Sequence, residues 1–179
     1  HGSSIVYGDL MGQGLVLRDL DSGAVRRLKG TPSLSGSPAW SPDGKTIALA
    51  SSEKQFEGIF LIAVDGTKVR RLPSPAGKLW SPTWSRDGSS ILVCAQGEAG
   101  AHMWRTEADG SGLKKLLRLE GNTGIHTAWS PDGAWIVYAR PSLDGPSGLG
   151  GSSLYAASAD GRRSLHVTGG GSVGDEYPS

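Results

Sequence analysis

The stretch AWSPDG at residues 39–44 decides the fold, because it returns as TWSRDG at 83–88 and as AWSPDG at 128–133. Its tryptophans, Trp40, Trp84 and Trp129, are 44 and 45 residues apart. A second marker keeps the same order: an Asp-Gly or Asp-Ser-Gly turn, followed each time by a basic stretch. These turns begin at Asp21, Asp65, Asp109 and Asp160. Markers that share one order and one spacing indicate an internal repeat.

Each repeat predicts four short antiparallel strands. The first strand ends on the tryptophan, and the second is a short apolar run such as TIALA at 46–50. The third strand, such as IFLIAV at 59–64, is joined through an Asp-Gly hairpin to a basic fourth strand, VRRL at 69–72. Between the first two strands, the turn aspartate bonds its own backbone and the glycine accepts positive φ. These turn pairs are Asp43 and Gly44, Asp87 and Gly88, and Asp132 and Gly133.

Repeated four-stranded units are typical of a β-propeller, an all-β fold in which each antiparallel sheet forms one blade. A single small sheet cannot bury two apolar faces by itself, so blades stack side by side around an axis. We expect the three repeat tryptophans to fill the space between neighbouring blades. No segment has a helical hydrophobic period of adequate length.

We interpret residues 1–179 as a single propeller domain with four sequence repeats. The last blade is composite, because YPS at 177–179 resembles the start of a first strand and HGSSIVY at 1–7 aligns with DGSSILV at 87–93. Two other arrangements also fit these ends: a homodimer that completes a larger, eight-bladed ring, and an excerpt of a longer propeller. The predicted repeats are 36–79, 80–123, 124–169, and 170–179 together with 1–30.

Composition narrows the classes of function. The net charge of +1 gives no sign of a nucleic-acid partner, and no apolar run is long enough to predict membrane insertion. Cys94 is the single cysteine, which excludes an internal disulfide and a cysteine-based metal cage. The Arg or Lys pairs of the fourth strands occur once per blade, so we expect them to be solvated edges rather than one phosphate-binding patch.

The quoted repeat, extended to PAWSPDGKTIALAS and IFLIAVDGTKVRRL, resembles the TolB-type, WD40-like propeller repeat over essentially the whole chain. It departs from the pattern at Arg86, at Thr127 and in a Gly-rich insertion at 141–153. The resemblance implies a periplasmic or extracellular setting and a protein or peptide partner that docks at one face or at the mouth of the central channel. It implies no cofactor.

A binding site is expected at the channel mouth, where the first strands begin. One ring position there is occupied by Ser37, Ser81, His126 and Tyr177, and Trp80 and Glu176 lie in the neighbouring ring. No carboxylate cluster with metal-ligand spacing occurs, so no metal is expected. Ser172 in GGSVG at 170–174 matches a nucleophile motif, but no helix follows it, and we expect no catalytic residue.

Three functional hypotheses follow. The first is a non-catalytic binding or scaffold module like the propeller of TolB. The second is the gating propeller of a larger serine peptidase of the prolyl-oligopeptidase type, since the same repeat occurs in such enzymes. The third is a small propeller enzyme with a channel-mouth ligand at His126.

Overall fold

The structure is a computed structural model that describes residues 3–8, 14–32, 36–119, 126–142 and 151–168. Within these ranges every regular element is a β-strand, and none is a helix. No helix that is long and apolar enough to cross a membrane is found among the described residues.

The strands form four antiparallel sheets, here called blades 1 to 4. Blade 1 contains β1 (Ser4–Gly8), β2 (Leu15–Asp19) and β3 (Val25–Leu28). Blade 2 contains β4 (Ala39–Trp40), β5 (Thr46–Ser51), β6 (Gly58–Ala63) and β7 (Val69–Leu72). Blade 3 contains β8 (Lys78–Trp84), β9 (Ser90–Gly97), β10 (Gly100–Glu107) and β11 (Lys114–Leu119). Blade 4 contains β12 (Thr127–Trp129), β13 (Trp135–Ser142), β14 (Gly151–Ser158) and β15 (Ser164–His166).

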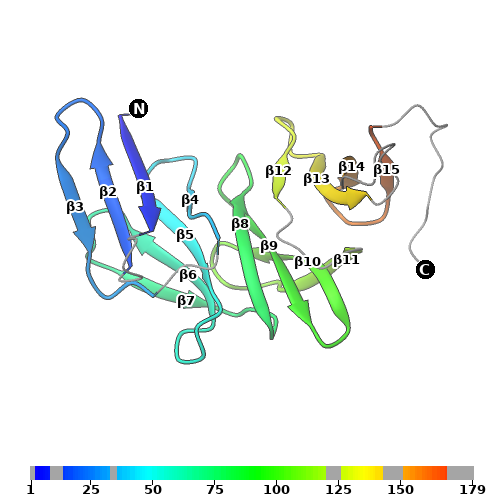
Figure 1. The fold of residues 1–179 in the computed structure, drawn as a ribbon, viewed down its shortest axis with the longest axis horizontal. Coiled ribbons are helices and arrows are strands. Elements are labelled where there is room, and N and C mark those ends of the chain that lie inside the picture. Colours follow the sequence, from blue (N-terminus) through cyan, green and yellow to red (C-terminus); the bar gives the residue numbers. More distant parts are fainter. Residues whose placement is uncertain (1–2, 9–13, 33–35, 120–125, 143–150, 169–179) are drawn as a thin grey trace.

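The blades stand side by side in sequence order, with blade 1 at one end of the row and blade 4 at the other (Figure 1). Each complete blade orders its strands as the chain does, from the first strand to the fourth. The predicted all-β propeller of antiparallel blades is confirmed. Blade 1 has the three strands assigned to the head of the chain, and the expected fourth strand from residues 170–179 lies outside the described residues.

The repeat is visible in the strand register. Each repeat tryptophan pairs with the isoleucine that opens the apolar second strand: Trp40 with Ile47, Trp84 with Ile91, and Trp129 with Ile136. All three isoleucines are completely buried, whereas the tryptophans are half-buried. The indole rings therefore lie along the edges of the apolar core.

Among the residues that the structure describes, the apolar core forms three clusters, one at each junction between neighbouring blades. Blades 1 and 2 meet around Leu17 and Ile62, with Trp40 packed against them. Blades 2 and 3 enclose a cluster that includes Leu61 and Ile91, with Trp84 at its side. The third cluster joins blade 3 to blade 4 and has Trp129 in the same position. Burial of apolar surface thus occurs between sheets, as stacked blades require.

Hydrogen bonds from the tryptophans tie successive blades together. The Trp84 indole N–H donates to the carbonyl of Ala39 at 3.2 Å, and that of Trp129 donates to the carbonyl of Thr83 at 3.5 Å. Each acceptor directly precedes the tryptophan of the previous blade. The second bond is at the limit of hydrogen-bond length, so the shorter Trp84 bond is the stronger of the two.

The first arginine of each VRRL stretch also joins two blades, which sequence reasoning did not foresee. Arg26 of blade 1 donates to the carbonyl of Val64 in blade 2. Arg70 of blade 2 donates to the carbonyls of Ala108 and, at 2.8 Å, Asp109 in blade 3. These exposed cations therefore hold the hairpin turn of the next blade.

Candidate functional site

The turns after the tryptophans form one rim of the molecule and share one hydrogen-bond pattern. In blade 3, the Ser85 hydroxyl donates to the Asp87 carboxylate at 2.6 Å, and the backbone N–H of Ser89 donates to the same oxygen at 3.0 Å. The hydrogen bond from Ser85 is the main cause that lowers the pKa of Asp87 to about 2. Asp43 and Asp132 accept matching bonds, and these likewise lower their pKa values. The three carboxylates are therefore ionised at neutral pH.

An open groove of about 830 Å³ lies beside these turns, between blades 2 and 3. Its apolar lining comes from Leu61 and Ala63 on β6 and from the ring of Trp84 on β8. The volume is within the range of about 300–1,000 Å³ that is usual for ligand sites. Its volume exceeds that of the groove at the next junction, which is about 320 Å³.

The groove carries opposite charges on two sides. Asp43 and Asp87 line it from the turns of blades 2 and 3, whereas Lys68 lines it from the β6–β7 turn and Arg70 from β7. Arg70 already donates to carbonyls of blade 3, whereas Lys68 is exposed at the groove. An apolar floor between acidic and basic sides can hold an extended peptide that has a charged residue at each end.

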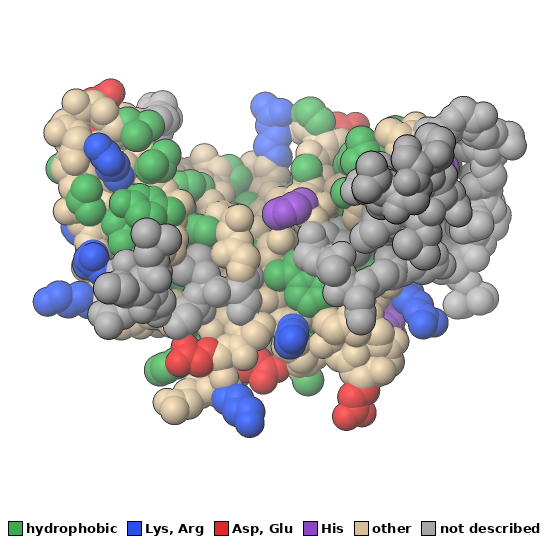
Figure 2. All heavy atoms as spheres, viewed as in Figure 1, with side chains coloured by type: hydrophobic (Ala, Val, Ile, Leu, Met, Phe, Trp, Pro, Cys, Tyr) green, Lys and Arg blue, Asp and Glu red, His purple; other side chains and the backbone are tan. Residues whose placement is uncertain are grey.

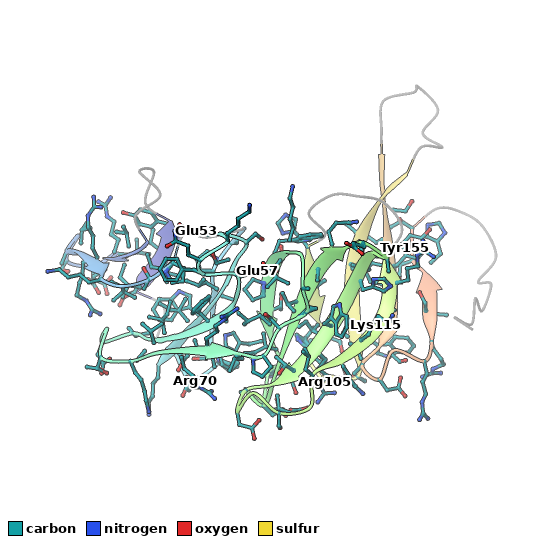
Figure 3. The ribbon with its side chains drawn as sticks, turned by 90° about the horizontal axis from the view of Figure 1, so that it is seen from below. Glu53, Glu57, Arg70, Arg105, Lys115 and Tyr155 are labelled. Carbon is teal, nitrogen blue, oxygen red and sulfur yellow. The ribbon has the colours of Figure 1, made fainter. Side chains whose placement is uncertain are left out.

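A second groove, at the junction of blades 3 and 4, has only about 320 Å³. Arg105 occupies the strand position there that Leu61 occupies in blade 2, since Arg105 pairs with Leu92 and Lys114 as Leu61 pairs with Ala48 and Arg70. The Arg105 guanidinium donates to Ser90 at 2.8 Å and lies 3.3 Å from Glu107. Figure 3 shows Arg70 on β7 and Arg105 on β10 in neighbouring blades. The long Arg105 side chain thus accompanies the smaller groove, whereas Leu61 accompanies the larger groove between blades 2 and 3.

The structure brings together three of the predicted channel-mouth segments. Gly36, beside Ser37, lies so near β8 that a Cβ on it would be 3.2 Å from the backbone N of Ser81 and 3.5 Å from Cβ of Trp80. On the other side of β8, the hydroxyls of Thr83 and Thr127 are 3.1 Å apart, which places His126 at the next first strand. Ser37 and His126 are exposed, and Ser81 is buried. Glu176 and Tyr177 lie outside the described residues, as does Ser172.

The backbone of β8 is irregular at this mouth. The pairing with β9 shifts register between Trp80 and Thr83, and Ser81 has φ of 52°, the one positive φ outside glycine among the described residues. The indole N–H of Trp80 is buried without a hydrogen-bond partner among the described residues. Strained backbone and unpartnered buried donors concentrate at functional positions.

Sequence reasoning missed the groove residues, although a signal for them exists. When the third strands are aligned on their hairpins, blade 2 has Leu61 and Ala63 where blade 3 has Arg105 and Glu107. This comparison predicts an open groove between blades 2 and 3 and a groove filled by charged side chains between blades 3 and 4. No group of three or more His, Cys, Asp or Glu side chains in the described part of the chain is arranged to hold a metal ion.

A comparison with models of known protein families shows which family the chain belongs to. A family model described as the TolB beta propeller domain matches residues 2–148. The chain belongs to the TolB β-propeller family. The departures at Arg86 and Thr127 therefore lie within a family repeat, and in this structure Arg86 reaches the next blade, where it donates to the carbonyl of Pro131 at 3.4 Å.

Solved structures share the fold at low sequence identity. TolB from Acinetobacter baumannii is 20% identical with a TM-score of 0.67, over 96% of this chain and 48% of its own. A putative TolB from Agrobacterium tumefaciens is 22% identical with a TM-score of 0.68, over 92% of this chain and 61% of its own. The tricorn protease is 14% identical with a TM-score of 0.68, over 94% of this chain and 16% of its own. The chain thus spans about half of one TolB structure and about three fifths of the other. A comparison with curated protein sequences finds no match.

Proposed function

We propose that this propeller is a non-catalytic binding module that docks an extended segment of a protein partner in the groove between blades 2 and 3. The observation that carries the proposal is the groove itself, with an apolar floor between ionised aspartates and basic side chains. Membership of the TolB family supports a protein partner and an extracytoplasmic bacterial location. One matched chain, at 12% identity and a TM-score of 0.64, comes from a nidogen–laminin complex, so the fold is compatible with protein binding.

Charge defines the occupant of the groove. A basic side chain fits near Asp43 and Asp87, because both carboxylates are ionised. An acidic side chain or a free carboxylate fits near Lys68. Between them, an apolar side chain can contact Leu61 and the Trp84 ring. The predicted ligand is therefore a short peptide with one apolar residue between opposite charges.

Peptides selected from a random library against the protein test the proposal, with dissociation constants measured by fluorescence anisotropy. The double substitution Leu61→Arg and Ala63→Glu copies the blade 3 arrangement into blade 2 and fills the groove. We expect it to weaken the selected peptides at least tenfold, and Lys68→Glu to weaken those with an acidic residue. Arg86→Glu, at the other junction, serves as the control and leaves binding unchanged. Peptides that bind the filled variant as well as the original protein would contradict groove docking.

The channel mouth is a second proposed docking position for the same function. The strained Ser81 and the unpartnered Trp80 indole N–H favour it. Trp80→Phe removes that donor and keeps most of the ring, and His126→Ala removes an exposed side chain. Peptides that weaken with these two substitutions and not with the filled groove assign docking to the mouth. Peptides that respond only to the filled groove contradict it.

A gating role in a larger peptidase is the alternative, favoured by the structural similarity to the tricorn protease. It predicts that the full gene product cleaves fluorogenic peptides. Absence of cleavage by that protein, with peptide binding retained, would eliminate it. The small-enzyme alternative at His126 is tested by analysis of zinc, manganese and iron in the purified protein. Absence of all three metals would eliminate it.

A further inference from the structure

We propose that the groove between blades 3 and 4 is a second binding site, which takes a small organic monocarboxylate with an apolar body. Arg86, Arg105 and Trp129 line this groove together with the turn around Asp132. Its volume of about 320 Å³ is within the range of about 300–1,000 Å³ that is usual for ligand sites. The proposal does not depend on peptide docking, which is assigned to the groove between blades 2 and 3, so the two proposals can fail separately.

Two departures of blade 3 from the repeat meet in this groove. Arg86 replaces the turn proline that the repeats of blades 2 and 4 contain. Arg105 takes the third-strand position that Leu61 has in blade 2, and it narrows the junction without closing it. A charged side chain at a junction that is otherwise apolar costs free energy unless it is paired. Two cations that the repeat does not require therefore come from different elements to one place, which favours a binding role for them.

Arg105 is held in one orientation by its own blade. Its Nε and Nη2 donate to the hydroxyl oxygen of Ser90 at 3.1 and 2.8 Å, and Ser90 is completely buried. The Ser90 hydroxyl in turn donates to the Glu107 carboxylate at 2.9 Å, and that carboxylate lies 3.3 Å from Nη2 of Arg105. Nη1 of Arg105 has no hydrogen-bond partner in the described part of the chain. One end of a fixed guanidinium is thus available to a ligand in the groove.

Arg86 supplies the second cation from the β8–β9 turn. Its side chain is exposed, and its bond across the groove to the Pro131 carbonyl is 3.4 Å long and therefore weak. It forms no ion pair with any residue that the structure describes. Along the upper rim in Figure 2, a basic side chain over the β8–β9 turn stands beside hydrophobic and acidic side chains over the β12–β13 turn. Arg86 can exchange its weak bond for a stronger, charge-assisted bond to a carboxylate.

The other lining residues define the rest of the ligand. Asp87 and Asp132 are ionised, and Oδ1 of each accepts hydrogen bonds within its own turn. Their charges repel a doubly charged phosphate more than a single carboxylate, which also matches the planar fork of a guanidinium. The Trp129 ring and Pro131 supply apolar surface for a flat body. The predicted ligand therefore carries one carboxylate on an aromatic or apolar body.

Benzoate is the probe, and its dissociation constant is measured by ligand-observed NMR titration of the protein. We expect saturable binding to one site. Arg105→Leu restores the residue of blade 2 and should weaken benzoate by about tenfold or more, because the fixed guanidinium is lost. Arg86→Pro restores the turn residue of the neighbouring blades and should weaken it by about threefold, as for an exposed ion pair. Arg118→Leu is the matched control, because Arg118 is exposed near the other end of β11 from Lys114, the partner of Arg105, and it leaves binding unchanged.

Two further ligands and one further variant complete the test. Benzamide has the same ring without the charge and should bind about tenfold more weakly than benzoate, and inorganic phosphate should not displace benzoate. Arg105→Lys keeps the charge but loses the planar fork, so it should also weaken benzoate, and it replaces Arg105→Leu if circular dichroism shows that the leucine variant has lost its fold. Absence of saturable benzoate binding would overturn the proposal. Equal affinity for benzamide, displacement by phosphate at a similar dissociation constant, or an equal loss in Arg118→Leu would overturn it as well.

Discussion

Replacing Trp84 by alanine removes the side chain that links blades 2 and 3 most directly. A buried aromatic side chain removes about 150–250 Å² from water, which at about 25 cal/mol per Å² corresponds to about 4–6 kcal/mol. Trp84 is only half-buried, and alanine keeps the first carbon, so the apolar loss is about 3 kcal/mol. The hydrogen bond to the Ala39 carbonyl adds about 1 kcal/mol. We expect the free energy of unfolding to fall by about 3–4 kcal/mol.

Urea denaturation followed by circular dichroism measures this loss. Trp84→Phe keeps an aromatic ring and loses only the indole N–H and part of the area, so about 1–2 kcal/mol is expected. It also provides a folded variant if the alanine protein fails to fold. Phe56→Ala, at an exposed position, is the control and changes stability by less than about 0.5 kcal/mol. A loss below about 0.5 kcal/mol for Trp84→Ala would refute the placement of the indole between blades.

Three further predictions concern the turns and the strained backbone. The pKa of Asp87 is lowered from 3.8 to about 2, so the ionised carboxylate stabilises the folded protein above about pH 4 and this contribution is lost as the pH falls toward 2. The free energy of unfolding of Asp87→Asn should therefore depend less steeply on pH in this window than that of the original protein. Ser81→Gly relieves a φ of 52° and should raise the free energy of unfolding by about 0.5–1 kcal/mol, seen as a higher urea midpoint. A lower midpoint would show that Ser81 is not strained. Gly77→Ala should lower the thermal midpoint strongly, because φ is 110° and the new Cβ would lie 2.2 Å from the carbonyl oxygen of Gln96. The Cβ of Gly44→Ala meets no atom within 4 Å, so this control variant should lower the midpoint less. Equal effects of the two variants would contradict the close approach at Gly77.

The sequence predicts the blade because the determinants of a blade are local. In blade 3, about ten residues contain Trp84, the turn at Asp87 and Gly88, and the apolar run that follows. Each of these features predicts its local structure without information about the other blades. The order and spacing of the repeats then predict the stacking, and the structure confirms the propeller of antiparallel sheets.

Features that depend on two blades are harder to predict. Arg70 is one of several exposed basic residues in the sequence, and only the packing of blade 3 brings the carbonyls of Ala108 and Asp109 to it. The groove exists because Leu61 is opposite a neighbouring turn that lies far away in the chain. The sequence around Ser81 likewise does not predict the bulge. The equivalent residue in blade 2, Ser37, precedes a first strand of only two residues, so comparison of the two repeats does not indicate a bulge.

A disulfide between adjacent blades tests the stacking most directly. Thr83 and Thr127 are 44 residues apart in sequence, yet their hydroxyls are 3.1 Å apart across the junction of blades 3 and 4. The native Cys94 is buried and its pKa is raised to about 12 by that burial, so it should not compete. We predict that Thr83→Cys combined with Thr127→Cys forms an internal disulfide on mild oxidation, detected by intact mass and by mobility without reductant. Oxidation no faster than that of Thr83→Cys combined with Ser111→Cys would contradict the stacked propeller.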